Sequence, residues 1–132
     1  MKELDLKKVT DEVERLCIEG NYFIGQEVLN KIKEAYEKEE SEVGKNILGQ
    51  IIENDEIAMN EQVPMCQDTG IVVVFLEIGT DVKINGDIYE AINEGVRRGY
   101  DKGYLRKSVV RHPLDRVNTK DNSPAIIHTK LI

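Results

Sequence analysis

Apolar side chains recur every three or four residues through the first part of the chain, a spacing that places them on one face of a helix. Three such sets follow one another: Leu6, Val9, Val13 and Leu16; Ile24, Val28, Ile32 and Tyr36; and Val43, Ile47 and Ile51. Gly20, Asn21 and the acidic run 37–40 separate these sets, and Ser41 can cap the third helix. The pattern therefore predicts a helical lobe over residues 1–62.

The period changes after this lobe. Residues 71–76 form a short, continuous, β-branched run, which is typical of a strand covered on both faces. Short runs at 82–84 and 125–128 predict two further strands. We therefore expect an α+β domain in which the N-terminal helical lobe packs on a small mixed β-sheet with a further helix. Residues 63–132 would form the strand-helix-strand part.

The further helix is predicted from about residue 88 to about residue 104, with Asp87 as its N-cap. Gly95, Gly99 and Gly103 recur every four residues and so share one stripe of this helix. Each glycine costs roughly 0.5–1 kcal/mol relative to alanine in a helix interior. We expect the stripe to allow close approach of another element.

The charge balance bounds the partners. The 132 residues include 25 acidic and 18 basic side chains, with a formal net charge of −7, which argues against nucleic acid or an anionic membrane surface. The basic residues are nevertheless concentrated in one segment: Arg97, Arg98, Lys102, Arg106, Lys107, Arg111 and Arg116. This segment suits a small anionic ligand, although a solvated helix and loop surface explains most of these side chains better.

The two cysteines indicate a cellular setting. With no signal peptide and no apolar stretch near the ~18 residues of a membrane span, Cys17 and Cys66 predict a reduced, cytoplasmic protein without a disulfide framework. Cys17 continues the first helical pattern, so we expect it to be a small core residue.

Cys66-Gln67-Asp68-Thr69-Gly70 places a thiol, an amide, a carboxylate and a hydroxyl on one short turn. A turn entering a strand needs only formers such as Asp68 and Gly70. Cys66 and Gln67 exceed that need, which makes this turn a candidate site.

Three motifs together resemble a known family. The segments 64–70 (PMCQDTG), 103–110 (GYLRKSVV) and 118–125 (NTKDNSPA) are similar to the N-terminal part of the alpha subunit of class I, iron–sulfur-dependent fumarate hydratases and L-tartrate dehydratases. The resemblance covers nearly the whole chain. It implies a hydro-lyase that hydrates fumarate to malate, or dehydrates a related hydroxy-dicarboxylate such as tartrate.

The resemblance also implies roles for individual residues. Cys66 would be the first of three cysteine ligands of a [4Fe–4S] cluster whose fourth iron binds substrate. Gln67 and Arg106 would bind the dicarboxylate substrate, since arginine can hold a carboxylate through two hydrogen bonds. Asp68 would orient the substrate or take part in acid/base catalysis. Without the resemblance, a turn carboxylate, a solvated amide and a helix-end cation would suffice.

The sequence departs from the family pattern in two respects. The other two cluster cysteines are absent, so we expect no stable cluster on this chain alone, which would be a fragment or a naturally divided piece. The complete site would need a beta subunit or C-terminal domain, in an oligomer. The second departure is Lys120, where the family has a glycine; a positive φ there would strain a lysine. We expect His112 and His128 to be structural.

Two other interpretations remain open from the sequence. Asp68-Thr69-Gly70 is also the signature triplet of aspartic proteases, although those enzymes are β-rich and have an apolar strand immediately before the aspartate. A non-catalytic helical interaction module would need neither Cys66 nor Arg106.

Overall fold

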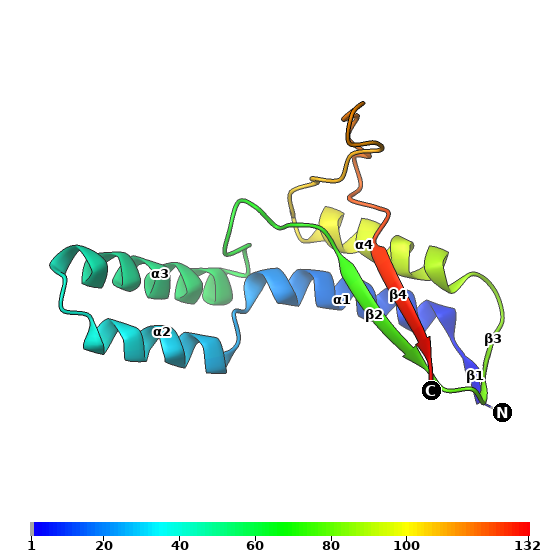
Figure 1. Cartoon of the computed structure of the whole chain (residues 1–132), viewed down its shortest axis with the longest axis horizontal. Helices are drawn as coiled ribbons and strands as arrows, with labels where there is room; N and C mark the ends of the chain where they lie inside the picture. Colours follow the sequence, from blue (N-terminus) through cyan, green and yellow to red (C-terminus); the bar gives the residue numbers. More distant parts are fainter. Residues whose placement is uncertain (1) are drawn as a thin grey trace.

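The computed structural model describes residues 2–132 of the chain (Figure 1). In chain order the elements are β1 (Lys2–Leu4), α1 (Leu6–Tyr22), α2 (Gln26–Lys38), α3 (Glu42–Glu61), β2 (Val73–Ile78), β3 (Val82–Ile84), α4 (Ile88–Lys102) and β4 (Ile126–Leu131). The α+β class, the four predicted helices and the three predicted strands are confirmed. Strand β1 escaped prediction, because three residues with two charges carry no strand pattern. No described helix combines the length and the apolar character needed to cross a membrane.

The predicted caps begin two of the helices. The Ser41 side chain accepts a hydrogen bond from the Gly44 amide at 3.3 Å and begins α3. The Asp87 carboxylate accepts from the Glu90 amide at 3.0 Å and begins α4. Each cap satisfies an amide that has no partner inside its helix.

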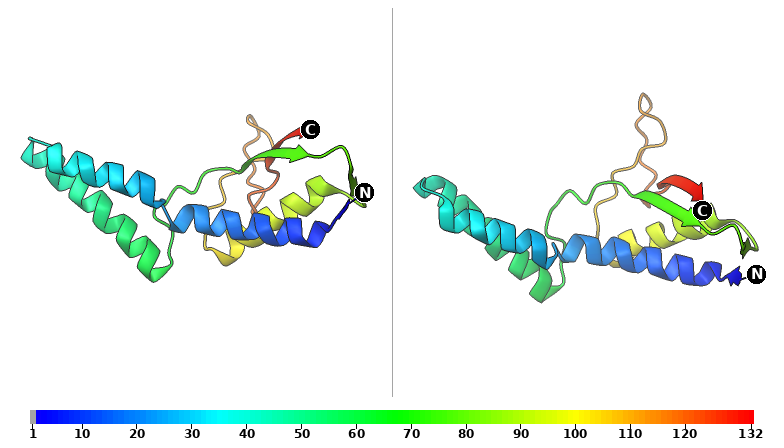
Figure 2. Two further views of the ribbon diagram at one scale, coloured as in Figure 1. Left: turned by 90° about the horizontal axis from the view of Figure 1, so that it is seen from below. Right: turned by 60° about the horizontal axis from the view of Figure 1, so that its bottom comes forward.

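Helices α1 and α4 lie against each other through the predicted glycine stripe (Figure 2). A Cβ atom added at Gly95 would lie 2.6 Å from the Thr10 carbonyl oxygen. One added at Gly99 would lie 2.7 Å from Cβ of Cys17. Because no side chain fits at these distances, the stripe is explained by helix packing, as its spacing predicted.

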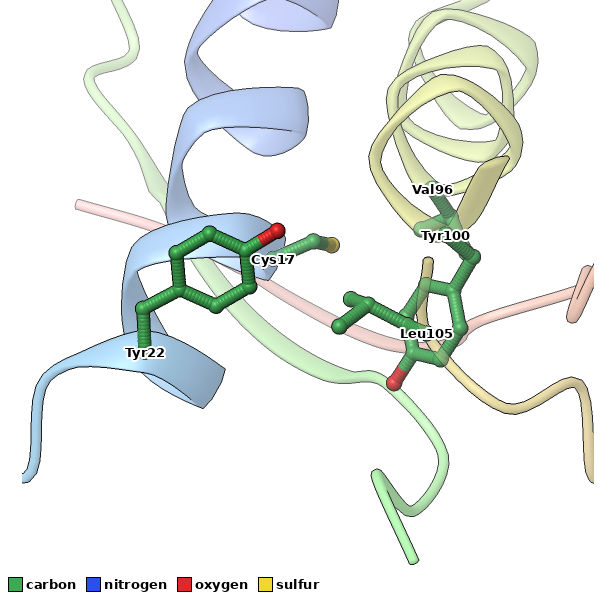
Figure 3. Packing of buried hydrophobic residues seen from close by; sticks show 5 residues of the cluster. All are labelled: Cys17, Tyr22, Val96, Tyr100 and Leu105. Atoms are coloured by element: carbon green, nitrogen blue, oxygen red, sulfur yellow. The ribbon is translucent and has the colours of Figure 1, made fainter. Parts of the chain in front are cut away.

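One of the two buried apolar clusters in the described residues lies between these two helices. Figure 3 shows Cys17 and Tyr22 of α1 facing Val96 and Tyr100 of α4, with Leu105 just beyond the end of α4. Cys17 is therefore a core residue, as expected. Burial raises the pKa of its thiol to about 11, because the thiolate would be poorly solvated there.

The strands form two separate parallel pairs in the described residues, β1 with β3 and β2 with β4. In this respect the fold differs from the predicted single mixed sheet. The reason is that β3 pairs with the N-terminal strand β1, whereas β2 pairs with the C-terminal strand β4, with Val73 opposite Ile126.

The β2–β4 pair has one covered face. Val74 and Ile127 pack against the buried residues Ile88 and Ile92 of α4, whereas Phe75 on the opposite face is 79% exposed. The Phe75 ring stacks on His128 of β4, with centroids 5.2 Å apart. The expectation that this strand is covered on both faces is therefore wrong for the described residues, since α1 and α4 cover only one face.

Helices α2 and α3 form a hairpin that projects away from the strands (Figures 1 and 2). Of the predicted helical lobe, only α1 approaches the strand layer, so the lobe as a whole does not pack on a sheet. The third predicted apolar stripe, Val43, Ile47 and Ile51, is exposed along one side of α3. The helix that its spacing predicted is confirmed.

Candidate functional site

An open pocket of about 570 Å³ lies where α3, the loop after it and the end of α4 meet. Its lining residues are Asn54, Pro64, Met65, Cys66, Gln67, Thr69, Tyr104 and Arg106. The structure thus brings together three of the four predicted site residues from motifs about 40 positions apart. A thiol, an amide and a guanidinium share one solvent-accessible cavity, a combination suited to an anionic ligand.

Helices α1 and α3 hold Met65, the residue that precedes the thiol. The Met65 amide donates a hydrogen bond to the Asn21 carbonyl at 2.9 Å. The Asn54 side chain donates to the Met65 carbonyl at 2.7 Å. With both backbone groups of Met65 engaged, Cys66 follows at the pocket with an exposed, free thiol.

Arg106 is presented by the way α4 ends. The Leu105 amide donates to the Tyr100 carbonyl at 3.0 Å, after Tyr104 adopts a positive φ of 53°. Leu105 is 2% exposed and anchors the chain in the core, whereas its neighbours Tyr104 and Arg106 are exposed and line the pocket.

Thr69 and Tyr100 connect the thiol-bearing loop to the arginine segment. The buried Tyr100 hydroxyl donates to the Thr69 carbonyl at 2.7 Å. The Thr69 hydroxyl in turn donates to the Arg106 carbonyl at 3.1 Å. Burial raises the pKa of Tyr100 to about 12, so its hydroxyl keeps its proton through the physiological range.

The segment 118–125 is hydrogen-bonded to these two loops. Its Asn122 is fully buried and makes hydrogen bonds to both of them. The Asn118 side chain donates to the Lys107 carbonyl at 2.9 Å and accepts from the Lys120 amide at 2.6 Å. Lys120 has a φ of +69°, so the strain expected for a lysine at this position is present.

Asp68 lies in the same loop but not among the pocket-lining residues. Its Oδ1 accepts a hydrogen bond from the Gly70 amide at 3.0 Å, and the side chain is exposed. The histidines lie elsewhere: His112 accepts from the Leu114 amide at 3.2 Å, and His128 stacks on Phe75. The sequence predicts structural roles for both histidines.

The metal-binding capacity of the site can be tested on the donors present. Among residues 2–132, no group of three or more His, Cys, Asp or Glu side chains is placed to hold a metal ion. Cys17, the other cysteine, is buried in the α1–α4 core. An exposed thiol at a pocket suits one ligand of an iron–sulfur cluster, and it does not suffice for a whole ligand set.

Four residues of this site were not singled out in the sequence. Asn54 and Tyr104 line the pocket, and Tyr100 and Asn122 hold its loops. Tyr104 and Asn122 lie inside the quoted motifs, and that is the one signal that could have found them. Asn54 and Tyr100 belong to helical segments in which nothing distinguishes them.

The fold and the pocket define an α+β protein that presents a single accessible thiol beside an arginine. The chain belongs to the fumarate hydratase (fumerase) family, whose model matches residues 10–132. This agrees with the resemblance carried by the three motifs, and the Asp68-Thr69-Gly70 triplet is part of that family's sequence rather than of an aspartic protease.

Curated relatives carry the names of tartrate dehydratases. A Methanocaldococcus jannaschii protein described as "Putative L(+)-tartrate dehydratase subunit alpha" is 45% identical over 117 residues, which is 87% of this chain and 41% of that protein. The L(+)-tartrate dehydratase subunit alpha of Escherichia coli strain K12 is 27% identical over 122 residues, or 92% of this chain and 40% of that protein. The chain thus spans about two fifths of the length of these relatives.

Proposed function

We propose that this chain supplies part of the active site of an iron–sulfur hydro-lyase that hydrates fumarate to malate or dehydrates a hydroxy-dicarboxylate such as tartrate. The observation that carries the proposal is that Cys66, Gln67 and Arg106 line one open pocket. The family description supports fumarate, and the names of the relatives support tartrate.

Arg106 and Gln67 bind and orient the substrate in this proposal. A dicarboxylate brings two negative charges, and the planar guanidinium can hold one carboxylate through two parallel hydrogen bonds. The Gln67 amide adds a donor at the same pocket. Fixing the substrate in this way places its reacting carbons for addition or loss of water.

Cys66 supplies one thiolate ligand of a [4Fe–4S] cluster. When bound, such a cluster provides an iron without a protein ligand, which acts as a Lewis acid on a hydroxyl group or water. The other two ligands come from residues outside this chain, because Cys17 is committed to the core. The chain alone is therefore expected to hold no stable cluster.

Asp68 is exposed in the loop that carries Cys66 and Gln67, although it does not line the pocket of this chain. In the complete assembly it orients the substrate or moves a proton at carbon. The Gly70 amide fixes the orientation of the Asp68 carboxylate through Oδ1. The complete enzyme is a cytoplasmic oligomer that includes a beta subunit or an equivalent C-terminal domain. The subunit names of the relatives and the two free cysteines support this assignment.

The experiment uses the complete assembly that contains this chain, under anaerobic conditions, with fumarate and L-tartrate as substrates. Cys66→Ser should lower the iron content and abolish most activity, whereas Cys17→Ala should keep the iron. Arg106→Lys should lower kcat/KM by roughly 10–1,000-fold with the iron unchanged, because the paired hydrogen bonds are lost. Arg111→Lys, in the same basic segment but outside the pocket, is the matched control.

Full activity and full iron content in Cys66→Ser would contradict the ligand assignment. Unchanged kcat/KM in Arg106→Lys would contradict the substrate-binding assignment. If neither replacement altered the function of the assembly, the chain would be a non-catalytic interaction module.

A further inference from the structure

Asn122 is a buried amide to which the proposed chemistry gives no role. It has no exposed surface. Its Oδ1 accepts hydrogen bonds from the Ser108 amide at 2.6 Å and the Val109 amide at 3.0 Å. Its Nδ2 donates to the Gly70 carbonyl at 3.1 Å. One side chain thus joins two loops that are nearly 40 residues apart in the sequence.

The backbone conformation shows what this residue contributes. Asn122 has a φ of +61°, a region that glycine occupies without strain and that asparagine tolerates better than most residues. The backbone alone would therefore favour glycine. The side chain adds the three hydrogen bonds, and their loss would be destabilising, because each would leave a buried polar group without a partner.

The two loops that Asn122 joins are those that carry the pocket residues. Gly70 follows Asp68 by two positions, and Ser108 follows Arg106 by two positions. The hydrogen bond from the Thr69 hydroxyl to the Arg106 carbonyl, at 3.1 Å, links the same loops on the side nearer the pocket. Asn122 and Thr69 therefore set the distance between the thiol-bearing loop and the arginine. Thr69 lines the pocket, whereas Asn122 does not.

We propose that Asn122 is a positioning residue, which fixes the loop bearing Cys66, Gln67 and Asp68 at its working distance from Arg106. The expected effect on catalysis rests on the proposed function. The structural role of Asn122 rests on its hydrogen bonds alone. Arg106 holds the substrate at one end, and the other loop acts on it. The spacing of the two loops must therefore be kept, since a displacement near 1 Å can cost on the order of 100-fold in rate.

The decisive variant is Asn122→Gly, which removes the amide and leaves the positive φ unstrained. In the complete assembly, kcat for the active substrate should fall roughly 10–100-fold, while KM changes less than threefold and the iron content is kept. The matched control is Asn118→Gly, because Asn118 bridges Lys107 and Lys120 without reaching the Gly70 loop. It should stay within threefold of the parent in both constants.

A second variant separates the two halves of the bridge. Asn122→Asp keeps an acceptor for the Ser108 and Val109 amides but loses the donor to the Gly70 carbonyl. A carboxylic acid regains that donor when protonated, and burial favours the neutral form. Relative to the parent at each pH, the activity of Asn122→Asp should therefore recover as the pH is lowered from 8 to 6. A purely structural defect would not recover in this way.

Amide hydrogen exchange tests the hydrogen bonds of Asn122 directly and needs no catalytic activity. Asn122→Gly should increase exchange at the Ser108 and Val109 amides at least tenfold and leave the centre of α4 unchanged. If the parent assembly converts neither fumarate nor tartrate, the proposed function fails, and the exchange result still decides the bridge. Unchanged exchange, or kcat within threefold of the parent in an active assembly, would overturn the inference.

A different pair of variants covers the case in which Asn122→Gly does not fold. Thr69→Val removes the hydroxyl bond to Arg106 at nearly constant volume, and Thr69→Ser keeps it. A loss of kcat in Thr69→Val that Thr69→Ser largely restores would support a fixed loop-to-loop distance. Equal activity of the two variants, close to the parent, would overturn it.

Discussion

The α1–α4 pair and the α2–α3 hairpin are both built from helices with apolar stripes, yet they use those stripes differently. In α1–α4 the helices approach through glycines, and Val96 at their interface has no exposed surface. In α2–α3 the stripe of α3 points to solvent, with Val43 70% exposed. Helical periodicity thus predicts the element, whereas the details of the contact surface decide what the element packs against.

The two regions also differ in what stabilises them. The α1–α4 pair relies on burial and on hydrogen bonds such as that from the Thr10 hydroxyl to the Ala91 carbonyl at 2.8 Å. The hairpin relies on the Ser41 cap, on the buried side chains Leu29 and Ala58, and on an exposed Lys33–Glu56 ion pair at 3.2 Å. Exposed ion pairs of this kind contribute about 0–1 kcal/mol.

Raising the pH should weaken the α1–α4 region most. The pKa of Cys17 is raised to about 11 and that of Tyr100 to about 12, so the folded chain holds protons that the unfolded chain releases from about pH 9. The free energy of unfolding should fall between about pH 9 and pH 12, by on the order of 3 kcal/mol at pH 11. Urea titrations at several pH values measure this fall. Cys17→Ala should flatten its lower part, and an unchanged curve would contradict the assignment.

The same substitution should have opposite signs in the two regions. Gly95→Ala forces a Cβ to within 2.6 Å of the Thr10 carbonyl oxygen and should cost about 1–3 kcal/mol or more. Gly49→Ala in α3 meets only the Tyr36 ring at 3.4 Å and should stabilise by about 0.5–1 kcal/mol through helix propensity. Thermal and urea unfolding of both variants measures the difference. Equal destabilisation would show that the hairpin is packed as tightly as the α1–α4 pair.

The smallest expected change in stability is in a third region, the loop that contains Lys120. Lys120→Gly should stabilise the chain by about 0.5–1 kcal/mol, because glycine adopts the φ of +69° without strain. Lys120→Ala is the control, since it shortens the side chain and keeps the strain. If both variants were equally stable, the side chain of Lys120 rather than its backbone would set the energy of this loop.

The sequence predicted the parts of the fold that depend on local information. Ser41 and Asp87 marked helix starts, and Gly95 and Gly99 marked a close contact whose partner the spacing could not name. The pairing of β3 with β1 was not predictable, because it depends on a short charged strand. The exposure of Val43 could not be predicted, because a helical period does not say whether another element covers the apolar stripe.

The candidate site was predicted only in part for a similar reason. Cys66 and Arg106 stood out by residue type and by the family resemblance, and the pocket contains both. The contribution of Asn122 depends on three hydrogen bonds across 13 to 52 positions of the chain. Such long-range bonds follow from the tertiary structure and leave no periodic signal. Strain at Lys120 was expected only if this position has a positive φ, and Lys120 has a φ of +69°.

The contrast between the two cysteines has a practical consequence. Cys17 is 8% exposed with a pKa raised to about 11, so near neutral pH it offers almost no thiolate to a reagent. Cys66 is exposed at the pocket. A maleimide dye or spin label added to the unmodified chain would therefore attach at one position. The native sequence already provides a single-site spectroscopic reporter at the mouth of the pocket.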